Sequence, residues 1–139
     1  MNPIRVALAD DEAGMRMVVR KMLEKSGGLA IVGEAENGEG LLDIVEEKRP
    51  QIVLLDVEMP RMTGVEAARV IQDTDPATIL IFITAHDQYM ADAFSVYAFD
   101  YLLKPFKVDR ALQTLERAKQ VIAMREAADQ AEKTFGITL

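Results

Sequence analysis

Cysteine is absent from this chain of 139 residues, which excludes disulfide bonds, thiol catalysis and zinc–thiolate sites and fits a reducing compartment. No apolar run approaches the length of a membrane span, and the first residues lack the basic and then apolar build of a signal peptide. Basic residues are also few, 16 against 23 acidic ones, and the net charge of −7 argues against a nucleic-acid-binding surface. We therefore expect a cytoplasmic domain that binds neither nucleic acid nor a membrane.

Five short runs of β-branched or aliphatic residues indicate strands, and three of them hold stretches that are apolar at every position, namely Val6–Ala9, Ile52–Leu55 and Ile79–Ile83. Strands covered on one face alternate between apolar and polar residues, whereas strands covered on both faces do not. The three uniform runs therefore predict central strands of a parallel sheet. The five runs are Ile4–Ala9, Leu29–Gly33, Ile52–Leu55, Ile79–Ile83 and Phe99–Leu103.

Segments with helical spacing separate these runs, so that strand and helix alternate five times. This alternation is the pattern of a doubly wound α/β sheet in a single domain. The apolar stripes expected on the helices are Met15, Val18, Val19, Met22 and Leu23; Leu41, Leu42 and Val45; Ala67, Val70 and Ile71; Met90, Ala93, Phe94 and Tyr97; and Ala111, Leu115, Ala118 and Ile122.

The composition changes towards the C-terminus. Residues 119–133 are rich in Ala, Glu, Lys, Arg and Gln, which favour helix, while large apolar residues at helical spacing become sparse after Ile122. We therefore divide the chain into a domain over residues 1–122 and a helical extension over residues 123–139. The extension is either a solvated helix or a linker or dimer helix that leads to a further domain.

Chemically active residues follow four of the five expected strands. Ligands bind at the carboxyl ends of the strands in open α/β sheets, so these residues are expected to meet at one edge. Three carboxylates, a hydroxyl and an amine converge there. In chain order the residues are Asp10 and Asp11 after the first strand, Asp56 after the third, Thr84 after the fourth, and Lys104-Pro105 after the fifth.

The three carboxylates would repel one another and raise each other's pKa if they came within a few ångströms. A hard divalent cation removes that penalty, and Mg²⁺ typically binds one or two carboxylates while it keeps several waters. Lys104 supplies a second positive charge. An aspartate between a metal and an ammonium group is suited to accept a phosphoryl group, because catalysis of phosphoryl transfer is mainly positioning and electrostatic stabilisation.

The set Asp10-Asp11, Asp56, Thr84 and Lys104-Pro105 resembles the site of the receiver domains of response regulators in two-component systems. The resemblance covers residues 4–122 and includes the loop Met59-Pro60-Arg61-Met62-Thr63-Gly64. Five matching positions at the correct strand ends form a far more specific signal than any one dipeptide. The resemblance implies a flavodoxin-like (βα)5 fold with strand order 2-1-3-4-5, and a histidine kinase as partner.

The resemblance also implies a role for each residue. Asp56 is the phosphoacceptor, and Mg²⁺ is bound by Asp10, Asp11, Asp56 and the main-chain carbonyl of Glu58. Thr84 and Lys104 contact phosphoryl oxygens, and the peptide bond between Lys104 and Pro105 is cis. Tyr101 is the aromatic switch, which turns inward when Thr84 moves. Such a domain is not a turnover enzyme; it carries out Mg²⁺-dependent self-phosphorylation and slow self-dephosphorylation only.

Simpler explanations exist for each position taken alone. Asp10 and Asp11 could cap a helix or form a turn, Thr84 could be an ordinary strand-end hydroxyl, and Tyr101 could be a core residue. His86, the only histidine, is expected on the surface. In the resemblance, His86 and Glu58 flank the phosphoryl site, and we hypothesise that they tune the lifetime of the phosphorylated Asp56.

The resemblance extends to signal output. The fourth helix, the fifth strand and the fifth helix are expected to change surface on phosphorylation and to form a homodimer or an output contact. That face carries Met90, Phe94 and Tyr97 near the charged residues Asp100, Lys107, Arg110 and Glu116. Residues 98–106 resemble receivers that precede LytTR-type DNA-binding domains, so transcription regulation through a further domain is one output. A stand-alone receiver that acts by protein contact is the alternative.

Three other classes fit the sequence less well. An aspartate-nucleophile phosphatase carries its two acids two residues apart after the first strand, whereas Asp10 and Asp11 are adjacent. A flavin-binding electron carrier needs a phosphate cradle rich in Ser, Thr and Gly at the same place. A pseudo-receiver that binds partners without phosphorylation would not need the full acidic set.

Overall fold

The uniformly apolar runs form the middle of a five-stranded parallel sheet, in the order β2-β1-β3-β4-β5, in a computed structural model that describes residues 2–136. Both the doubly wound class and the predicted strand order are confirmed. β3 and β4 are buried at every position, as expected for strands covered on both faces. The strands are β1 (Ile4–Ala9), β2 (Leu29–Ala35), β3 (Ile52–Leu55), β4 (Ile79–Thr84) and β5 (Asp100–Leu103).

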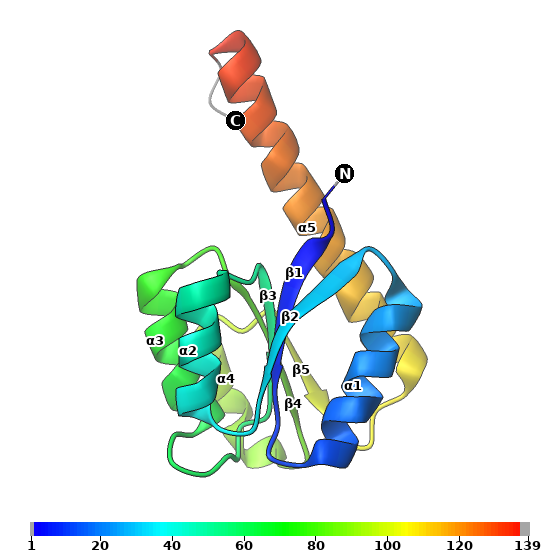
Figure 1. The fold of residues 1–139 in the computed structure, drawn as a ribbon, viewed down its shortest axis with the longest axis vertical. Helices are drawn as coiled ribbons and strands as arrows, with labels where there is room; N and C mark the ends of the chain where they lie inside the picture. Colours follow the sequence, from blue (N-terminus) through cyan, green and yellow to red (C-terminus); the bar gives the residue numbers. More distant parts are fainter. Residues whose placement is uncertain (1, 137–139) are drawn as a thin grey trace.

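Helices cover both faces of the sheet. Figure 1 shows α1 and α5 on one side and α2, α3 and α4 on the other. Alternate residues of β3 serve the two sides: Ile52 and Leu54 pack in the cluster under α1 and α5, and Val53 and Leu55 in the cluster under the other three helices. The helices are α1 (Ala13–Ser26), α2 (Gly38–Lys48), α3 (Gly64–Thr74), the 3₁₀ turn η1 (Asp87–Tyr89), α4 (Met90–Ser95) and α5 (Val108–Phe135).

Four members of the expected apolar stripes are exposed: Val18, Val70, Met90 and Tyr97. Val18 of α1 and Val70 of α3 are 47% and 44% exposed, because each lies at the edge of its stripe and the neighbouring positions fill the contact with the sheet. Tyr97 lies beyond the end of α4, has a positive φ of 49° and is 84% exposed. Val96 is buried in the place predicted for Tyr97. The side chain of Phe94 lies outside the described part of the structure.

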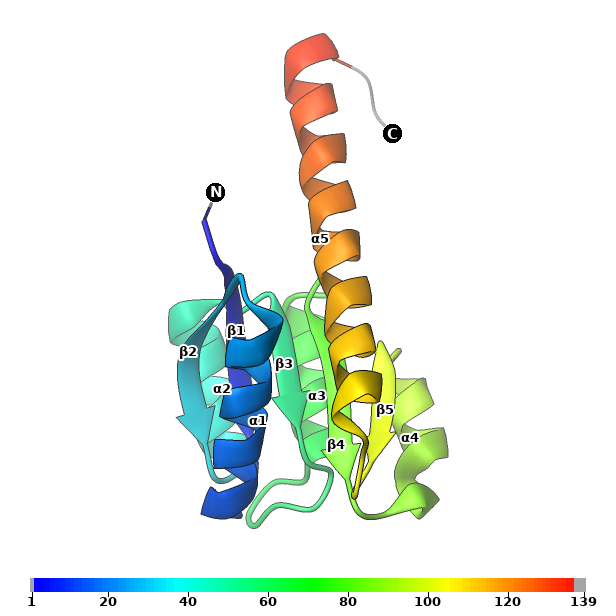
Figure 2. The ribbon, with the colours of Figure 1, turned by 90° about the vertical axis from the view of Figure 1, so that its right-hand side faces the viewer.

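α5 is 28 residues long and continues past the body of the domain, away from the sheet edge at which the strands end (Figures 1 and 2). No break in the helix marks the predicted boundary after residue 122. Arg125 donates a hydrogen bond of 2.6 Å to the carbonyl of Ala77, which ties the helix to the loop before β4. We call residues 123–135 the α5 extension. Among residues 2–136, none of the helices is long and apolar enough to cross a membrane.

Candidate functional site

Lys104 holds two buried carboxylates together at the carboxyl edge of the sheet. Its Nζ lies 2.8 Å from Asp10 Oδ2 and 2.9 Å from Asp56 Oδ2, although the three residues are far apart in the sequence. The side chains of Asp10, Asp56 and Lys104 are only 5%, 8% and 12% exposed. Burial alone would lower the pKa of Lys104, but its hydrogen bonds to both carboxylates raise that pKa above the usual value. The lysine is therefore a permanent cation at the centre of the site.

Main-chain amides hold the other oxygens of these two carboxylates. Asp10 Oδ1 accepts a hydrogen bond of 2.9 Å from the amide of Glu12, and Asp56 Oδ1 accepts one of 3.1 Å from the amide of Glu58. Buried charges are costly unless they are paired and hydrogen-bonded. The two loops therefore fix the directions of both carboxylates before any ligand arrives.

Asp11 completes an acidic cluster with Asp10 and Asp56. Each of the three offers a carboxylate oxygen, and these oxygens lie within 4.8 Å of one another. Three carboxylates against one ammonium leave the cluster with two surplus negative charges. Oxygen donors at this spacing, two of them buried and one exposed, fit a hard divalent cation that keeps part of its hydration shell.

Gly64, at the start of α3, allows the loop after β3 to close tightly. A Cβ at this position would lie 2.0 Å from the carbonyl oxygen of Asp56 and 2.9 Å from Val57 Cα. The amide of Gly64 donates a hydrogen bond of 2.7 Å to the carbonyl of Val57. Thr63 caps the helix by accepting a hydrogen bond from the amide of Glu66. The main chain behind Asp56 is thus held against the first turn of α3.

Thr84, the last residue of β4, is fully buried, and its Oγ1 has no hydrogen-bond partner among the residues that the structure describes. Buried hydroxyls are nearly always hydrogen-bonded, so an orphan in a native protein calls for an explanation. The main chain of Thr84 is held, because its carbonyl accepts a hydrogen bond of 2.8 Å from the amide of Lys104. Thr84 and Lys104 are therefore joined through their main chains, while the bonding capacity of the Thr84 hydroxyl is unused. The peptide bond that follows Lys104, to Pro105, is cis.

Tyr101 of β5 packs half-buried against the core beneath α4. Its ring centroid lies 6.1 Å from that of Phe82, and its hydroxyl donates a hydrogen bond to the main-chain carbonyl of His86. Burial raises the pKa of Tyr101 to about 12, with smaller contributions from Asp87 and Asp56. The phenol is thus a neutral donor that ties β5 to the loop between β4 and α4.

A polar network, not expected from the sequence, joins the two loops beside the acidic cluster. Glu58 accepts a hydrogen bond of 3.0 Å from the hydroxyl of Tyr89, and its other oxygen lies 3.0 Å from Nε2 of His86. Hydrogen bonding to Glu58 raises the pKa of Tyr89. The side chains of His86 and Glu58 are 41% and 49% exposed, which agrees with a surface position for the histidine. The two residues expected to flank the site are therefore in contact with each other.

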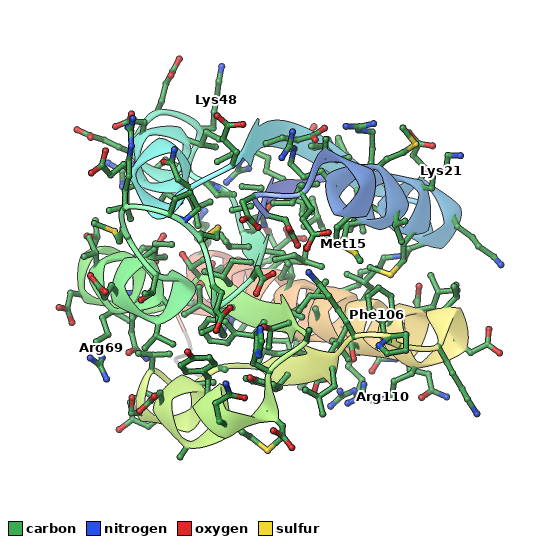
Figure 3. All side chains as sticks on the ribbon, turned by 90° about the horizontal axis from the view of Figure 1, so that it is seen from below. Met15, Lys21, Lys48, Arg69, Phe106 and Arg110 are labelled. Atoms are coloured by element: carbon green, nitrogen blue, oxygen red, sulfur yellow. The ribbon has the colours of Figure 1, made fainter. Side chains whose placement is uncertain are left out.

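Sequence reasoning placed the five central residues correctly at one edge but missed several of their neighbours. Besides Tyr89, it missed Arg16, which donates a hydrogen bond of 2.7 Å to the carbonyl of Asp10, and the pairing of Lys104 with Asp10 as well as Asp56. No local pattern predicts these contacts, because they depend on side-chain direction. Figure 3 looks onto this edge of the sheet. Its labels include Met15 of α1, Phe106 in the segment before α5, and Arg69 of α3.

Comparison with known proteins points to a single family. A family model described as the response regulator receiver domain matches residues 6–116. The transcriptional regulatory protein BtsR of Escherichia coli is 36% identical over 140 residues, which cover 97% of this chain and 58% of that protein. The sensory transduction protein LytT of Bacillus cereus is 37% identical over 117 residues, which cover 84% of this chain and 48% of that protein.

Solved structures give the same result. The REC domain of AraT, a response regulator from Geobacillus stearothermophilus, superposes with a TM-score of 0.83 at 28% sequence identity, covering 91% of this chain and 99% of that chain. The chain spans about half the length of the curated relatives that it matches.

Proposed function

The chain belongs to the response regulator receiver domain family of two-component systems, and from this premise we propose that Asp56 accepts a phosphoryl group from a histidine kinase. One observation carries the proposal: the Asp56 carboxylate is buried, lies 2.9 Å from the Lys104 ammonium and shares its pocket with two further acids. A structural ion pair would need one acid for one lysine. A bound cation explains why the pocket holds three carboxylates for one lysine.

The transfer needs little covalent chemistry from the protein. An oxygen of Asp56 attacks the phosphorus of the phosphohistidine, an acyl phosphate forms, the P–N bond breaks, and the imidazole nitrogen that leaves takes up a proton. Lys104 neutralises charge on the equatorial oxygens, and the free hydroxyl of Thr84 donates a hydrogen bond to one of them. The amide of Glu58 holds the attacking carboxylate in place throughout.

Mg²⁺ is the cation that this donor set favours. Asp11, Asp56 and the main-chain carbonyl of Glu58 would bind it, and Asp10 would contact it through water. When bound, the ion neutralises the surplus charge of the acids and of the incoming phosphoryl group. Lys104 and the main-chain amide of Glu58 keep their own role, which is to orient the Asp56 carboxylate.

Phosphorylation is read out through Thr84 and Tyr101. The new oxygens draw the Thr84 side chain towards Asp56, which changes the space available to Tyr101 and to the loop that its hydroxyl holds at His86. The result is a population shift between two packings of α4, β5 and α5.

Glu58 and His86 set the lifetime of the phosphoryl group on Asp56 by controlling access of water. Substitution of either residue should change the dephosphorylation rate, and an unchanged rate in both variants would remove them from this role.

The output is a homodimer through α4, β5 and α5, or transcription regulation through a further domain of LytTR type. BtsR is named a transcriptional regulatory protein, and the region that matches this chain covers only 58% of that protein. Asp100 of this face is already paired with Arg110 and Arg117 of the same chain, so a dimer would have to exchange or extend these pairs. A receiver that acts by protein contact alone is the second candidate.

The decisive experiment is incubation of the protein with Mg²⁺ and a small acyl phosphate, followed by intact mass measurement. We expect the added mass of one phosphoryl group on the wild type and none on Asp56→Asn, which keeps the size of the side chain. Equal uptake by both proteins would overturn the assignment of Asp56, and loss of uptake in Asp56→Asn but not on removal of Mg²⁺ would overturn only the metal.

A further inference from the structure

We propose that residues 121–135 of α5 form an antiparallel two-helix coiled coil with the same segment of a second copy of this chain. The association uses neither Asp56 nor the surface of α4, so it is independent of the proposed phosphorylation. It gives a partner to the part of the molecule that projects farthest from the core (Figure 2).

An apolar stripe runs along the α5 extension at alternating spacings of three and four residues. This spacing is the heptad pattern by which two helices pack side by side. The members of the stripe are Val121, Met124, Ala128, Ala131 and Phe135. The helix ends directly after the stripe, where Gly136 adopts a left-handed conformation and donates a hydrogen bond to the carbonyl of Glu132.

Val121 packs partly buried against the core cluster under α1 and α5, but the rest of the stripe lies beyond the body of the domain. The sheet-facing side of α5 ends at Ile122, and the next residue on that side, Arg125, bonds to Ala77 at the rim of the body. Met124 and Phe135 are each 71% exposed. An isolated helix of this length is marginal in water, and large exposed apolar side chains on one line indicate a contact surface.

The charged residues that flank the stripe favour an antiparallel arrangement of the two helices over a parallel one. With Val121, Ala128 and Phe135 at the first core position of the heptad, Arg125 and Glu132 both occupy the same flanking position. Antiparallel helices bring these positions together, so that Arg125 of each copy meets Glu132 of the other. Parallel helices would instead place Gln120 against Arg125 and Ala127 against Glu132, which gives no ion pair.

The same register matches side-chain sizes. Met124 packs against Phe135 of the second copy, a favourable contact between sulfur and an aromatic ring, at both ends of the contact. Ala128 packs against Ala131 in the middle, where small side chains let the two helices approach closely. Two heptads bury less surface than a standard stable interface, so the dimer should be weak, with a Kd of roughly 1 μM or higher.

Two variants with the same substitution test the surface. Ala128 lies in the stripe, whereas Ala123 is exposed on the opposite side of the same helix. In sedimentation equilibrium of the Asp56→Asn protein, we expect Ala123→Glu to associate like its parent and Ala128→Glu to associate at least tenfold more weakly. Circular dichroism shows whether both variants keep their helix. Equal association of the two variants, or a monomeric parent up to about 1 mM, would overturn the proposal.

Cysteine cross-linking tests the direction, and the chain has no cysteine of its own to interfere. We expect an oxidised mixture of Met124→Cys and Phe135→Cys proteins to form a mixed disulfide dimer, identified by mass. Met124→Cys alone should not cross-link, because its two thiols would lie about 16 Å apart along the helices. Self-cross-linking of Met124→Cys in place of the mixed dimer would contradict the antiparallel arrangement.

Discussion

The hydroxyl of Thr84 and that of Thr114 are both fully buried, but their surroundings differ. Thr114 donates a hydrogen bond to Asp100, whereas Thr84 has no partner among the described residues. A buried polar group without a partner costs about 1–3 kcal/mol, so the fold gains nothing from the Thr84 hydroxyl. The benefit of this hydroxyl must therefore come from a bound state.

Replacement of each threonine by valine should change the free energy of unfolding in different directions. We expect Thr84→Val to leave the free energy of unfolding unchanged or to raise it by about 1 kcal/mol, because an unpaired hydroxyl is removed. Thr114→Val should lower it by about 1–3 kcal/mol, because Asp100 loses a partner. Urea unfolding measures both. A large loss of stability in Thr84→Val would mean that its hydroxyl has a partner in the unphosphorylated protein.

The side chains that make the site could be predicted from the sequence because they follow strands that parallel topology brings to one edge. Asp10, Asp56 and Lys104 needed no more than the strand order. Their pairing pattern could not be predicted, since a shift of one rotamer decides whether Lys104 contacts one acid or two. The contact of Glu58 with His86 and Tyr89 has the same origin in side-chain direction.

At the scale of elements, the close contact between the loop after β3 and α3 depends on Gly64. We expect Gly64→Ala to destabilise the protein by several kcal/mol and to reduce phosphoryl uptake, because the new Cβ would overlap the carbonyl of Asp56. Gly14 in α1 offers the matched control. A Cβ there meets nothing within 4 Å, so Gly14→Ala should raise the free energy of unfolding by about 0.5–1 kcal/mol. Equal stability of the two variants would contradict the close contact.

β5 is tied to α5 through Asp100, which accepts hydrogen bonds from Arg110, Arg117 and Thr114. Arg117 also lies over the ring of Phe99, at 5.4 Å from its centroid. Burial alone would raise the pKa of Asp100, but the hydrogen bonds from Arg110 and Thr114 lower it to about 2. The carboxylate form is thus strongly preferred in the folded protein.

The pH dependence follows from the sign of this shift. A pKa below the unfolded value of 3.8 stabilises the fold above that pH, and the contribution is lost as the pH falls towards about 2. We expect Asp100→Asn to cost about 2 kcal/mol at pH 7 and the difference from wild type to shrink at pH 3. Denaturant unfolding at both pH values checks this, with the exposed Asp129→Asn as control. A difference that stays constant with pH would contradict it.

The elements themselves were predictable where burial is complete and less so at edges. β3 and residues 79–83 of β4 are apolar because both faces of these strands are covered, and the bounds of the two strands differ from the prediction by one residue at most. β2 continues to Ala35, beyond the predicted Gly33, because Glu34 and Ala35 pair with Leu8 and Ala9 of β1. The polar side chain of Glu34, which interrupts the apolar run, is paired with Arg20 and Arg16 of α1. A distant ion pair of this kind leaves no periodic pattern in the sequence.

At the scale of the molecule, the acidic cluster predicts that a divalent cation stabilises the whole fold. A ligand that binds only the folded state at 100 times its Kd adds about 2.7 kcal/mol. We expect Mg²⁺ to raise the melting temperature of the wild type at constant ionic strength, and to raise that of Asp11→Asn much less. Asp11 is exposed and holds no buried group in place, so its loss should not unfold the protein. An equal rise in both proteins would place the cation elsewhere.

One helix connects the two ends of the molecule. α5 begins four residues after Lys104, and its last turns lie beyond the opposite end of the sheet, the end at which β1 begins (Figure 2). A displacement at the base of α5 would be carried to its tip through the continuous helix. A rod of 28 residues is about 42 Å long, and a tilt of roughly 5° at its base would swing the tip by about 4 Å. A small rotation of α5 at the acidic edge of the sheet is therefore enlarged at the far end of the helix.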